Sequence, residues 1–385
     1  MSIPFIIFAF ILVFTATVYV RQILKFTRGL SRLVPGGNKQ SFTVAVLVPA
    51  RNEEAHVESC IHSLLRQEYP KDLYRIIVID DQSTDGTADI VRRLVRENPS
   101  RLTLLSVDQE PKEVSPKINA LRFGVKESGS DLLFMTDADC EVSPEWISST
   151  VRYFEGGVGV VTGTTLYKNN NTTSRQLFGI QFLDFLSHTA CAAGAIGNGA
   201  VNNCNGSNMA IRRRAYDDVG GYDSLARLNS GDDSLLAQKI SSSGTWQVRF
   251  NLDRSSFVTT GPVRTWKEFF RQRMRWAAQT ANYRADALFF LVCSFFYYIV
   301  LTAVLIGSAF SPPWIMLFMI AFLPKLFVDY HILKKFTTFS GTQYLMHFYP
   351  QAALVHVPTV LVAVLGGFFG RFDWKGRATE RRTDV

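Results

Sequence analysis

The sequence predicts an α/β domain with a parallel sheet, combined with apolar segments long enough to enter a membrane. Between Thr43 and Asp139, short apolar runs alternate with segments of helical spacing, which is typical of a parallel α/β sheet. Both ends of the chain are apolar, and only 19% of its 385 residues are charged, below the roughly 25% of an average soluble domain. The composition is therefore that of a soluble domain joined to membrane segments.

The first apolar segment predicts a membrane helix. Residues 3–20 carry no charge and just exceed the lower limit of roughly 17 residues for a crossing. A signal peptide is the alternative, but no basic residue precedes the run and no small-residue cleavage site follows it. Only basic charges follow, at Arg21, Lys25, Arg28, Arg32 and Lys39. By the positive-inside rule we expect a retained helix over residues 1–24 with a cytosolic flank.

Four apolar runs are predicted to be buried strands with helices between them: residues 43–50, 74–81, 102–107 and 131–139. The second and the fourth end in carboxylates. Parallel α/β sheets bind ligands beyond the carboxyl ends of their strands. We therefore expect the binding edge to carry Asp80, Asp81, Asp137 and Asp139.

Asp137 and Asp139 stand two residues apart at a strand end, where alternate side chains of extended backbone point the same way. The two carboxylates are thus predicted to address one ligand, although two solvated loop carboxylates are the common alternative for such a pair. Asp80 and Asp81 either cap the following helix or accept hydrogen bonds from a ligand. Position at the end of a buried strand favours the ligand role.

The stretch 155–281 is less regular. It contains a run of small residues at 189–199 and a Gly-Asp-Asp triplet at 231–233, which could cap a helix. Near 264–284, apolar side chains alternate with Arg271, Arg273 and Arg275. That pattern predicts an amphipathic helix lying in the headgroup plane of a membrane.

The region 287–370 is expected to hold two or three transmembrane or re-entrant helices. Residues 287–310 predict one crossing, 314–333 a second that is interrupted by proline and lysine, and 344–370 a third that contains two prolines. Three crossings would leave the basic tail, 371–385, outside, whereas the charge rule favours a cytosolic tail. We expect 344–370 to be re-entrant, with 314–333 as the alternative.

Charge and cysteine content narrow the function classes. The net charge of +8 arises from basic residues that cluster beside apolar runs, which favours a membrane surface over nucleic acid as the partner. Five cysteines without a CxxC spacing argue against a disulfide framework or a structural zinc site and fit a reducing cytosol.

Seven segments then carry a family resemblance. In chain order they are VLVPARNEEAHVESCIHSLLRQEYP, IIVIDDQSTDGT, SPKINAL, FMTDADCEVSPEWI, NGSNMAIRRRAYDDVGGYD, SGDDSLLAQKI and QRMRW. Together they resemble family 2 glycosyltransferases, the inverting group that includes cellulose and hyaluronan synthases and ceramide glucosyltransferase. The likeness covers residues 43–280 and implies a single GT-A domain, a Rossmann-like nucleotide-sugar fold.

The resemblance implies a role for each matching residue. The nucleoside would be held by Pro49, Arg51, Glu53 and Asp81, and the rest of the donor would lie near Lys117 and the Asp137–Asp139 pair. The same pair would hold Mg²⁺ or Mn²⁺. Asp233 would be the general base. Asp232, where the family more often has Glu, would lie by the acceptor and diphosphate and is the alternative base. Gln272, Arg275 and Trp276 match the QxxRW motif, which implies a place by the acceptor and diphosphate.

The activity so implied is transfer of a sugar, from a UDP-sugar, to a hydroxyl of a membrane-associated acceptor. A lipid acceptor is favoured, because few predicted helices are present to form a polymer channel. A processive polysaccharide synthase is the first alternative, and a non-catalytic nucleotide-sugar-binding protein the second. We expect an integral protein of a bacterial cell membrane with its catalytic domain in the cytosol and no nucleic-acid partner.

Overall fold

The structure, a computed structural model, describes residues 3–107, 115–169, 172–225, 232–278, 280, 283–369, 372–374 and 377–379. The chain forms two compact units, each built from separate stretches of sequence. The helical unit comprises Met1–Arg32, Asn171–Asn198 and Val263–Phe372. The sheet unit comprises Leu33–Asn170, Gly199–Pro262 and Asp373–Val385.

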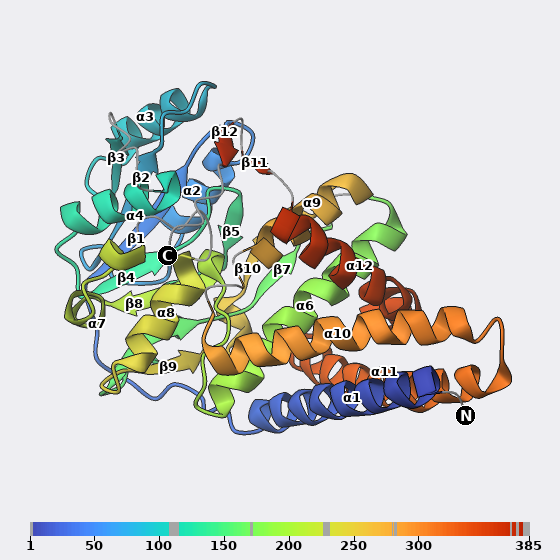
Figure 1. Ribbon diagram of the computed structural model, residues 1–385. Coiled ribbons are helices and arrows are strands. Elements are labelled where there is room, and N and C mark those ends of the chain that lie inside the picture. The colour runs from blue at the N-terminus through green and yellow to red at the C-terminus, as the bar shows by residue number, and fades with distance from the viewer. Residues whose placement is uncertain are drawn as a thin grey trace. The chain divides into compact units, whose positions relative to one another are not determined.

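The sheet unit is built on a seven-stranded sheet in the order β3-β2-β1-β4-β8-β6-β9 (Figure 1). Four of its strands are parallel neighbours: β1 (Val44–Ala50), β2 (Tyr74–Asp80), β3 (Leu102–Ser106) and β4 (Leu132–Met135). In their register, Val46 of the central strand β1 lies opposite Ile76 on one side and Phe134 on the other. All three side chains are fully buried, and the four predicted strands are confirmed.

The remaining strands make the sheet mixed and not wholly parallel as the sequence predicted. β8 (Met209–Arg212) runs antiparallel to both β4 and β6 (Val158–Thr162), and β9 (Gln247–Phe250) is parallel to β6. All three strands come from the irregular stretch 155–281, where strand–helix alternation was absent. A second, small sheet joins β5 (Cys140–Val142), β10 (Val258–Thr260) and β7 (Thr165–Tyr167).

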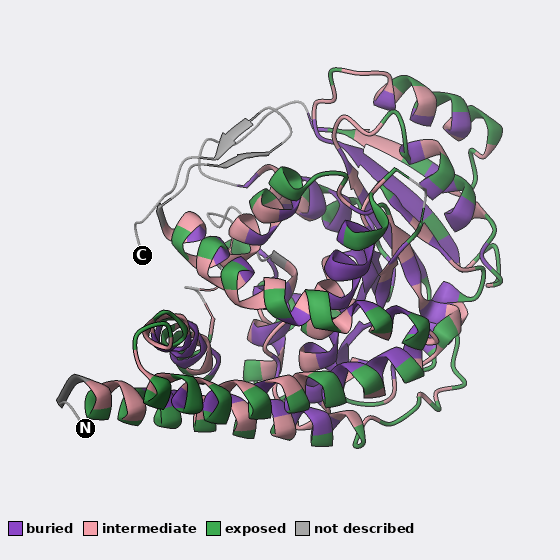
Figure 2. Cartoon of the chain, turned by 90° about the vertical axis from the view of Figure 1, so that its right-hand side faces the viewer, coloured by how far each residue is buried: buried purple, intermediate pink, exposed green. Residues whose placement is uncertain are grey.

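Helices cover the sheet with their apolar sides. Figure 2 shows that the strands are the most continuously buried part of the sheet unit. They are α2 (Val57–Leu65), α3 (Thr87–Glu97), α4 (Pro116–Glu127), α5 (Trp146–Val151), α7 (Arg213–Asp218) and α8 (Asp232–Ser242). Pro116 begins α4, where a missing amide hydrogen costs nothing. Gly124 then lets α4 approach the sheet, since a Cβ there would lie 2.9 Å from Ile79 Cδ1.

The helical unit contains α1 (Ile3–Leu30), α6 (Arg175–Gly197), α9 (Trp266–Ala278), α10 (Ala285–Gly307), α11 (Pro312–Ser340) and α12 (Tyr349–Phe369). By length and composition, four helical segments could cross a membrane: Phe5–Leu30, Ala285–Gly307, Pro312–Ser340 and Gln343–Phe368. Of these, α1, α10 and α11 lie side by side (Figure 1). The expected apolar segments are therefore all helical.

Proline does not end the C-terminal helices. α11 continues through Pro324 and α12 through Pro358, so the expected interruption of 314–333 is wrong. Neighbouring helices and local adjustments satisfy the backbone groups that a proline releases in such an environment. The re-entrant course of 344–370 and the side on which the tail lies stay predictions. Of the tail, the structure describes β11 (Phe372–Trp374) and β12 (Arg377–Thr379), which pair with one another.

The small-residue run lies in α6, where it packs against α1. A Cβ on Gly194 would lie 2.3 Å from the carbonyl oxygen of Phe26, and one on Gly197 would lie 2.0 Å from that of Gly29. Small residues of this kind let membrane helices bring their backbones together. By its packing α6 belongs to the helical unit, although the sequence analysis included it in a domain over 43–280. The expected domain boundaries stay a prediction.

Candidate functional site

The carboxyl ends of β1 and β2 are tied to each other by backbone and side-chain bonds. The Asp81 amide donates to the Ala50 carbonyl over 2.9 Å, and Arg51 Nη1 donates to the Asp81 carbonyl over 2.6 Å. Pro49 lies opposite Ile79 in the same pair of strands. The structure therefore brings Arg51 and Asp81, both predicted as donor-binding residues, into direct contact.

The turns after these two strands hold a feature that the sequence analysis did not identify. Asn52 has a φ of 51° and Gln82 a φ of 55°, a left-handed conformation that is uncommon outside glycine. Asn52 Oδ1 accepts from the Thr84 amide over 2.8 Å, and Ser83 Oγ accepts from the Asn52 amide over 3.1 Å. Strained turns of this kind persist where the surroundings hold them, typically at ligand sites.

Glu53 follows in the same loop. Its amide donates to Thr87 Oγ1 over 2.7 Å, and its carbonyl accepts from the first amides of α2. Glu54 Oε2 accepts from the Gly86 amide over 2.8 Å. The loops that precede α2 and α3 thus form one bonded surface at the binding edge predicted for the sheet.

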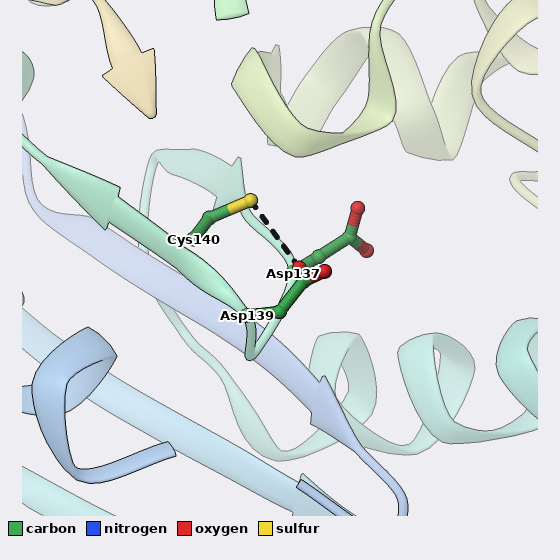
Figure 3. A group of neighbouring side chains, drawn as sticks. All are labelled: Asp137, Asp139 and Cys140. Carbon is green, nitrogen blue, oxygen red and sulfur yellow. Dashed lines mark hydrogen bonds between the residues drawn. The ribbon is translucent and has the colours of Figure 1, made fainter. Parts of the chain in front are cut away.

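Asp137 and Asp139 lie in the turn that links β4 to β5 (Figure 3). Oxygen atoms of the two carboxylates and the sulfur of Cys140 all lie within 4.8 Å of one another. Lys117, at the start of α4, pairs with Asp137 through an Nζ–Oδ1 distance of 2.9 Å, and Thr260 Oγ1 donates to Asp139 Oδ2 over 3.4 Å. The predicted neighbours Lys117, Asp137 and Asp139 are therefore together.

The donor set suits a hard divalent cation. Burial, and after it the negative charges of Asp139 and Asp137, raises the pKa of the Cys140 thiol. The same causes raise the pKa of the Cys60 thiol. A raised pKa favours the protonated thiol, and Cys140 Sγ donates to Asp139 Oδ1. Two neighbouring carboxylates remain as oxygen ligands, the type that Mg²⁺ and Mn²⁺ prefer.

Asp233 lies in the first turn of α8, where two backbone amides hold its carboxylate. Gly206 N donates to Oδ2 over 2.7 Å and Ser234 N to Oδ1 over 2.6 Å. Gly206 is needed for this approach, because a Cβ there would lie 2.7 Å from Oδ2. The predicted base is therefore held in place by groups that the sequence analysis did not single out.

The strand order brings Asp233 to the same edge as the other carboxylates. Gly206 begins the short 3-10 turn Gly206–Asn208, which leads directly into β8. Met209, the first residue of β8, lies opposite Met135, the last residue of β4. Because Asp137 follows Met135 by two residues, the antiparallel pairing places the support of Asp233 beside the Asp137 turn.

The start of α8 is anchored by further polar contacts. Ser234 Oγ donates to Asn203 Oδ1 over 2.7 Å and accepts from the Cys204 amide over 3.1 Å. Gln238 Nε2 donates to the Asn202 carbonyl over 2.9 Å. Asp232 begins the helix, but its side chain lies outside the described part of the chain, as does Gly231. The predicted role of Asp232 stays a prediction.

Gln272, Arg275 and Trp276 lie on α9, in the helical unit. Arg273, between them, was expected to face the headgroups, yet its side chain is only 3% exposed. It is buried because Asp184 of α6 neutralises it at 2.5 Å. The sequence missed Asp184, since a single acidic residue in a mostly apolar segment has no partner that spacing can identify.

Comparison with known proteins now identifies the family. The profile of glycosyl transferase family 21 matches residues 8–381, nearly the whole chain. The chain belongs to glycosyl transferase family 21. The predicted GT-A fold is supported by the mannosyltransferase PcManGT from Pyrobaculum calidifontis, solved with GDP-Man and Mn²⁺, which aligns with a TM-score of 0.65 at 17% identity. That alignment covers 94% of this chain and 99% of the other, and at such identity it speaks for the fold alone.

Two curated relatives of this family 21 member are similar over part of their length. The probable glycosyltransferase YdaM of Bacillus subtilis is 28% identical over 241 residues, which are 61% of this chain and 54% of YdaM. The beta-monoglucosyldiacylglycerol synthase of Nostoc is 28% identical over 183 residues, 46% of this chain and 37% of the synthase. The chain thus spans about half the length of YdaM and about a third of the length of the Nostoc synthase. The prediction of a family 2-type glycosyltransferase is confirmed at the level of family and fold.

Proposed function

We propose that the chain transfers a sugar from a nucleotide diphosphate sugar, with inversion, to a hydroxyl of a membrane lipid. One observation carries the proposal: Asp137, Asp139 and the support of Asp233 meet at one edge of the sheet, in register through Met135 and Met209. Inverting transfer needs these two functions close together, a charge-neutralising site for the leaving group and a base for the acceptor.

The donor would lie across the carboxyl ends of β1, β2 and β4. The bonded loops around Arg51, Glu53 and Asp81 would bind the nucleoside, with Pro49 in the last part of β1, just before its end at Ala50, and the resemblance favours uridine. Asp139, with Asp137, would hold Mg²⁺ or Mn²⁺, which when bound neutralises the diphosphate as it leaves. Lys117 pairs with Asp137 at 2.9 Å and lies within reach of the same negative charge, so it would help to bind the diphosphate.

Asp233 would then accept the proton of the acceptor hydroxyl. The hydroxyl oxygen forms its new bond to the anomeric carbon while the bond from that carbon to the diphosphate oxygen breaks, and the electron pair leaves with the diphosphate. A single displacement of this kind inverts the anomeric carbon. The amides of Gly206 and Ser234 hold the carboxylate in one orientation, which matters because a base must lie within hydrogen-bond reach of its proton.

The choice of acceptor rests on the membrane helices and on the relatives. Four helical segments that could cross a membrane and a relative named for glucosyldiacylglycerol synthesis support a lipid. The resemblance would add Gln272, Arg275 and Trp276 near the acceptor or the diphosphate. A processive polymerase is the second candidate, because another relative is the poly-beta-1,6-N-acetyl-D-glucosamine synthase of Staphylococcus epidermidis, 27% identical over 196 residues. The cytosolic face of a bacterial cell membrane is the proposed location.

Product analysis tests the proposal. Membranes that contain the enzyme are incubated with a panel of labelled nucleotide sugars, with and without added lipid extract. We expect label from one donor in the organic-extractable fraction, together with release of the nucleoside diphosphate. Label in ethanol-insoluble material would support the polymerase instead. Binding of a donor without release or transfer would contradict both and leave a non-catalytic binding protein.

A further inference from the structure

Asp184 of α6 and Arg273 of α9 form an ion pair inside the helical unit. Asp184 Oδ2 lies 2.5 Å from Arg273 Nε, and the two side chains are 9% and 3% exposed. Burial is the largest effect and raises the pKa of Asp184, but the charges of Arg273, His188 and His356 and the hydrogen bond from Arg273 together lower the pKa below its ordinary value. The carboxylate is therefore ionised, and the pair is a true charge pair.

The guanidinium of Arg273 also contacts two residues of the QxxRW motif. Arg273 Nη1 donates to Gln272 Oε1 over 2.6 Å. The guanidinium carbon lies 4.1 Å from the centre of the Trp276 ring and 4.6 Å from the centre of the Phe269 ring. One cation thus fixes the amide of Gln272 through a hydrogen bond and the indole of Trp276 through a cation–π contact.

Helix α6 supplies the other side of this arrangement. The Trp276 ring lies 5.8 Å from the ring of Phe185 and 6.1 Å from that of His188, centre to centre. Three residues before Asp184, Gln181 exchanges two hydrogen bonds of 3.1 Å with the backbone of Val263, ahead of α9. Helix α6 is therefore bonded to the α9 segment at two polar sites: Gln181 bonds to Val263, and Asp184 pairs with Arg273.

Burying two charges is costly, and well-packed apolar residues often serve stability as well or better. A buried ion pair is therefore weak evidence that its residues serve only to stabilise the fold. Here the pair touches Gln272 and Trp276, two of the three residues that the proposed function assigns to the acceptor and diphosphate. By contrast, a second buried pair of this unit, Lys325–Asp329 at 2.7 Å, joins residues of α11 and contacts none of them in the interactions described.

We propose that Asp184 is a positioning residue for sugar transfer: through Arg273 it sets the side chains of Gln272 and Trp276, and with them the face of α9 that includes Arg275. The inference rests on the proposed function. In this role Asp184 acts through Arg273 and not directly on the donor or the acceptor. Loss of its charge should therefore reduce turnover while leaving the donor site of the sheet unit intact.

Asp184→Asn tests this with little change in shape. In purified full-length protein reconstituted in lipid, we expect kcat to fall by about 10- to 100-fold, the range seen when a supporting partner of an active-site group is removed. The Kd for the nucleoside diphosphate should change less than about threefold. Asp184→Glu restores the charge and should recover at least part of kcat. An unchanged kcat in Asp184→Asn would overturn the proposal.

Asp329→Asn is the matched control, because it breaks the other buried pair of the same unit. We expect it to lower thermal stability while the kcat of the folded fraction stays near that of the wild type. Equal losses of kcat in Asp184→Asn and Asp329→Asn would show a general effect of broken ion pairs and overturn the positioning role. If Asp184→Asn does not fold, Arg273→Lys keeps the charge but loses the planar fork; a wild-type kcat in that variant would contradict the proposal.

A second readout does not depend on activity. Hydrogen exchange of the α9 amides, Trp266–Ala278, should accelerate in Asp184→Asn and not in Asp329→Asn. If the wild type transfers no sugar from any donor tested, the proposed function fails, while the exchange result still shows whether Asp184 of α6 holds α9 in place through Arg273. If the wild type is active and exchange and kcat are unaffected in Asp184→Asn, only the positioning role fails.

Discussion

The charged residues of the two units differ in how far water can reach them. In the sheet unit, Lys117 and Asp137 are 29% and 39% exposed although they pair at 2.9 Å. In the helical unit, Arg273 and Asp184 are buried, and Lys325 is buried against Asp329. A partly exposed pair can exchange its partner for a ligand, whereas a buried pair holds helices in place. The difference predicts that substitutions in the first set cost activity directly. In the second set, loss of the Lys325–Asp329 pair should cost stability, whereas loss of the Asp184–Arg273 pair should lower turnover through Gln272 and Trp276.

Asp233→Asn should have the largest effect on activity. The substitution removes the proposed base but keeps a side chain of the same size, so kcat should fall by about 10²–10⁴ while the donor still binds. Turnover and donor Kd of the purified protein measure this. Asp89→Asn, on the exposed surface of α3, is the control and should leave both unchanged. Turnover near the wild-type value in Asp233→Asn would assign the base to another residue.

Asp329→Asn should have the largest effect on stability. It leaves the Lys325 ammonium buried without its carboxylate, and removal of one partner of a buried pair typically costs about 3–5 kcal/mol. Tyr19, whose hydroxyl donates to Asp329 Oδ1 over 2.8 Å, also ties α1 to this group. Thermal unfolding in detergent should register the loss. A melting temperature equal to that of the wild type would show that this pair contributes nothing to the helical unit.

Asp139→Asn should impair use of the metal. Chelation with EDTA is expected to stop transfer by the wild type, and added Mg²⁺ or Mn²⁺ to restore it. The variant should need about 10- to 100-fold more metal for half-maximal rate, because the loss of a group that supports a metal site typically lowers metal affinity by this factor. Transfer that continues unchanged in EDTA would mean that Lys117 and other cationic groups neutralise the diphosphate without a metal.

Gly194→Ala should have the smallest effect. The added Cβ meets the Phe26 carbonyl oxygen at 2.3 Å, so α1 and α6 must separate, at a cost of about 1–3 kcal/mol for overpacking. Gly156→Ala in the sheet unit is the control, because a Cβ there meets nothing within 4 Å. Chemical denaturation of the two variants gives the comparison. An equal stability in both would mean that the helices accommodate the methyl group.

Local sequence was sufficient for the parts of this chain in which chemistry follows directly from a regular element. The apolar runs before Asp81 and Asp137 are short, buried and end in carboxylates, so the strands and the edge they share could be predicted. The helical segments at both ends follow from predominantly apolar stretches of sufficient length. Pro324 misled the prediction for α11 because the packing of neighbouring helices, which tolerates a proline, is not visible in a single segment.

Only the tertiary structure decided how distant segments meet. Gly206 supports Asp233 from 27 positions away, and Asp184 neutralises Arg273 from 89 positions away, because the antiparallel strand β8 and the helix α6 fold back onto elements far along the chain. No periodicity or spacing encodes such pairs. The sequence by itself determined the fold family, the Asp137–Asp139 pair and the membrane-compatible ends, which depend on local composition and order. Which groups hold those residues in place was decided by packing, since burial and hydrogen bonding act through space and not along the chain.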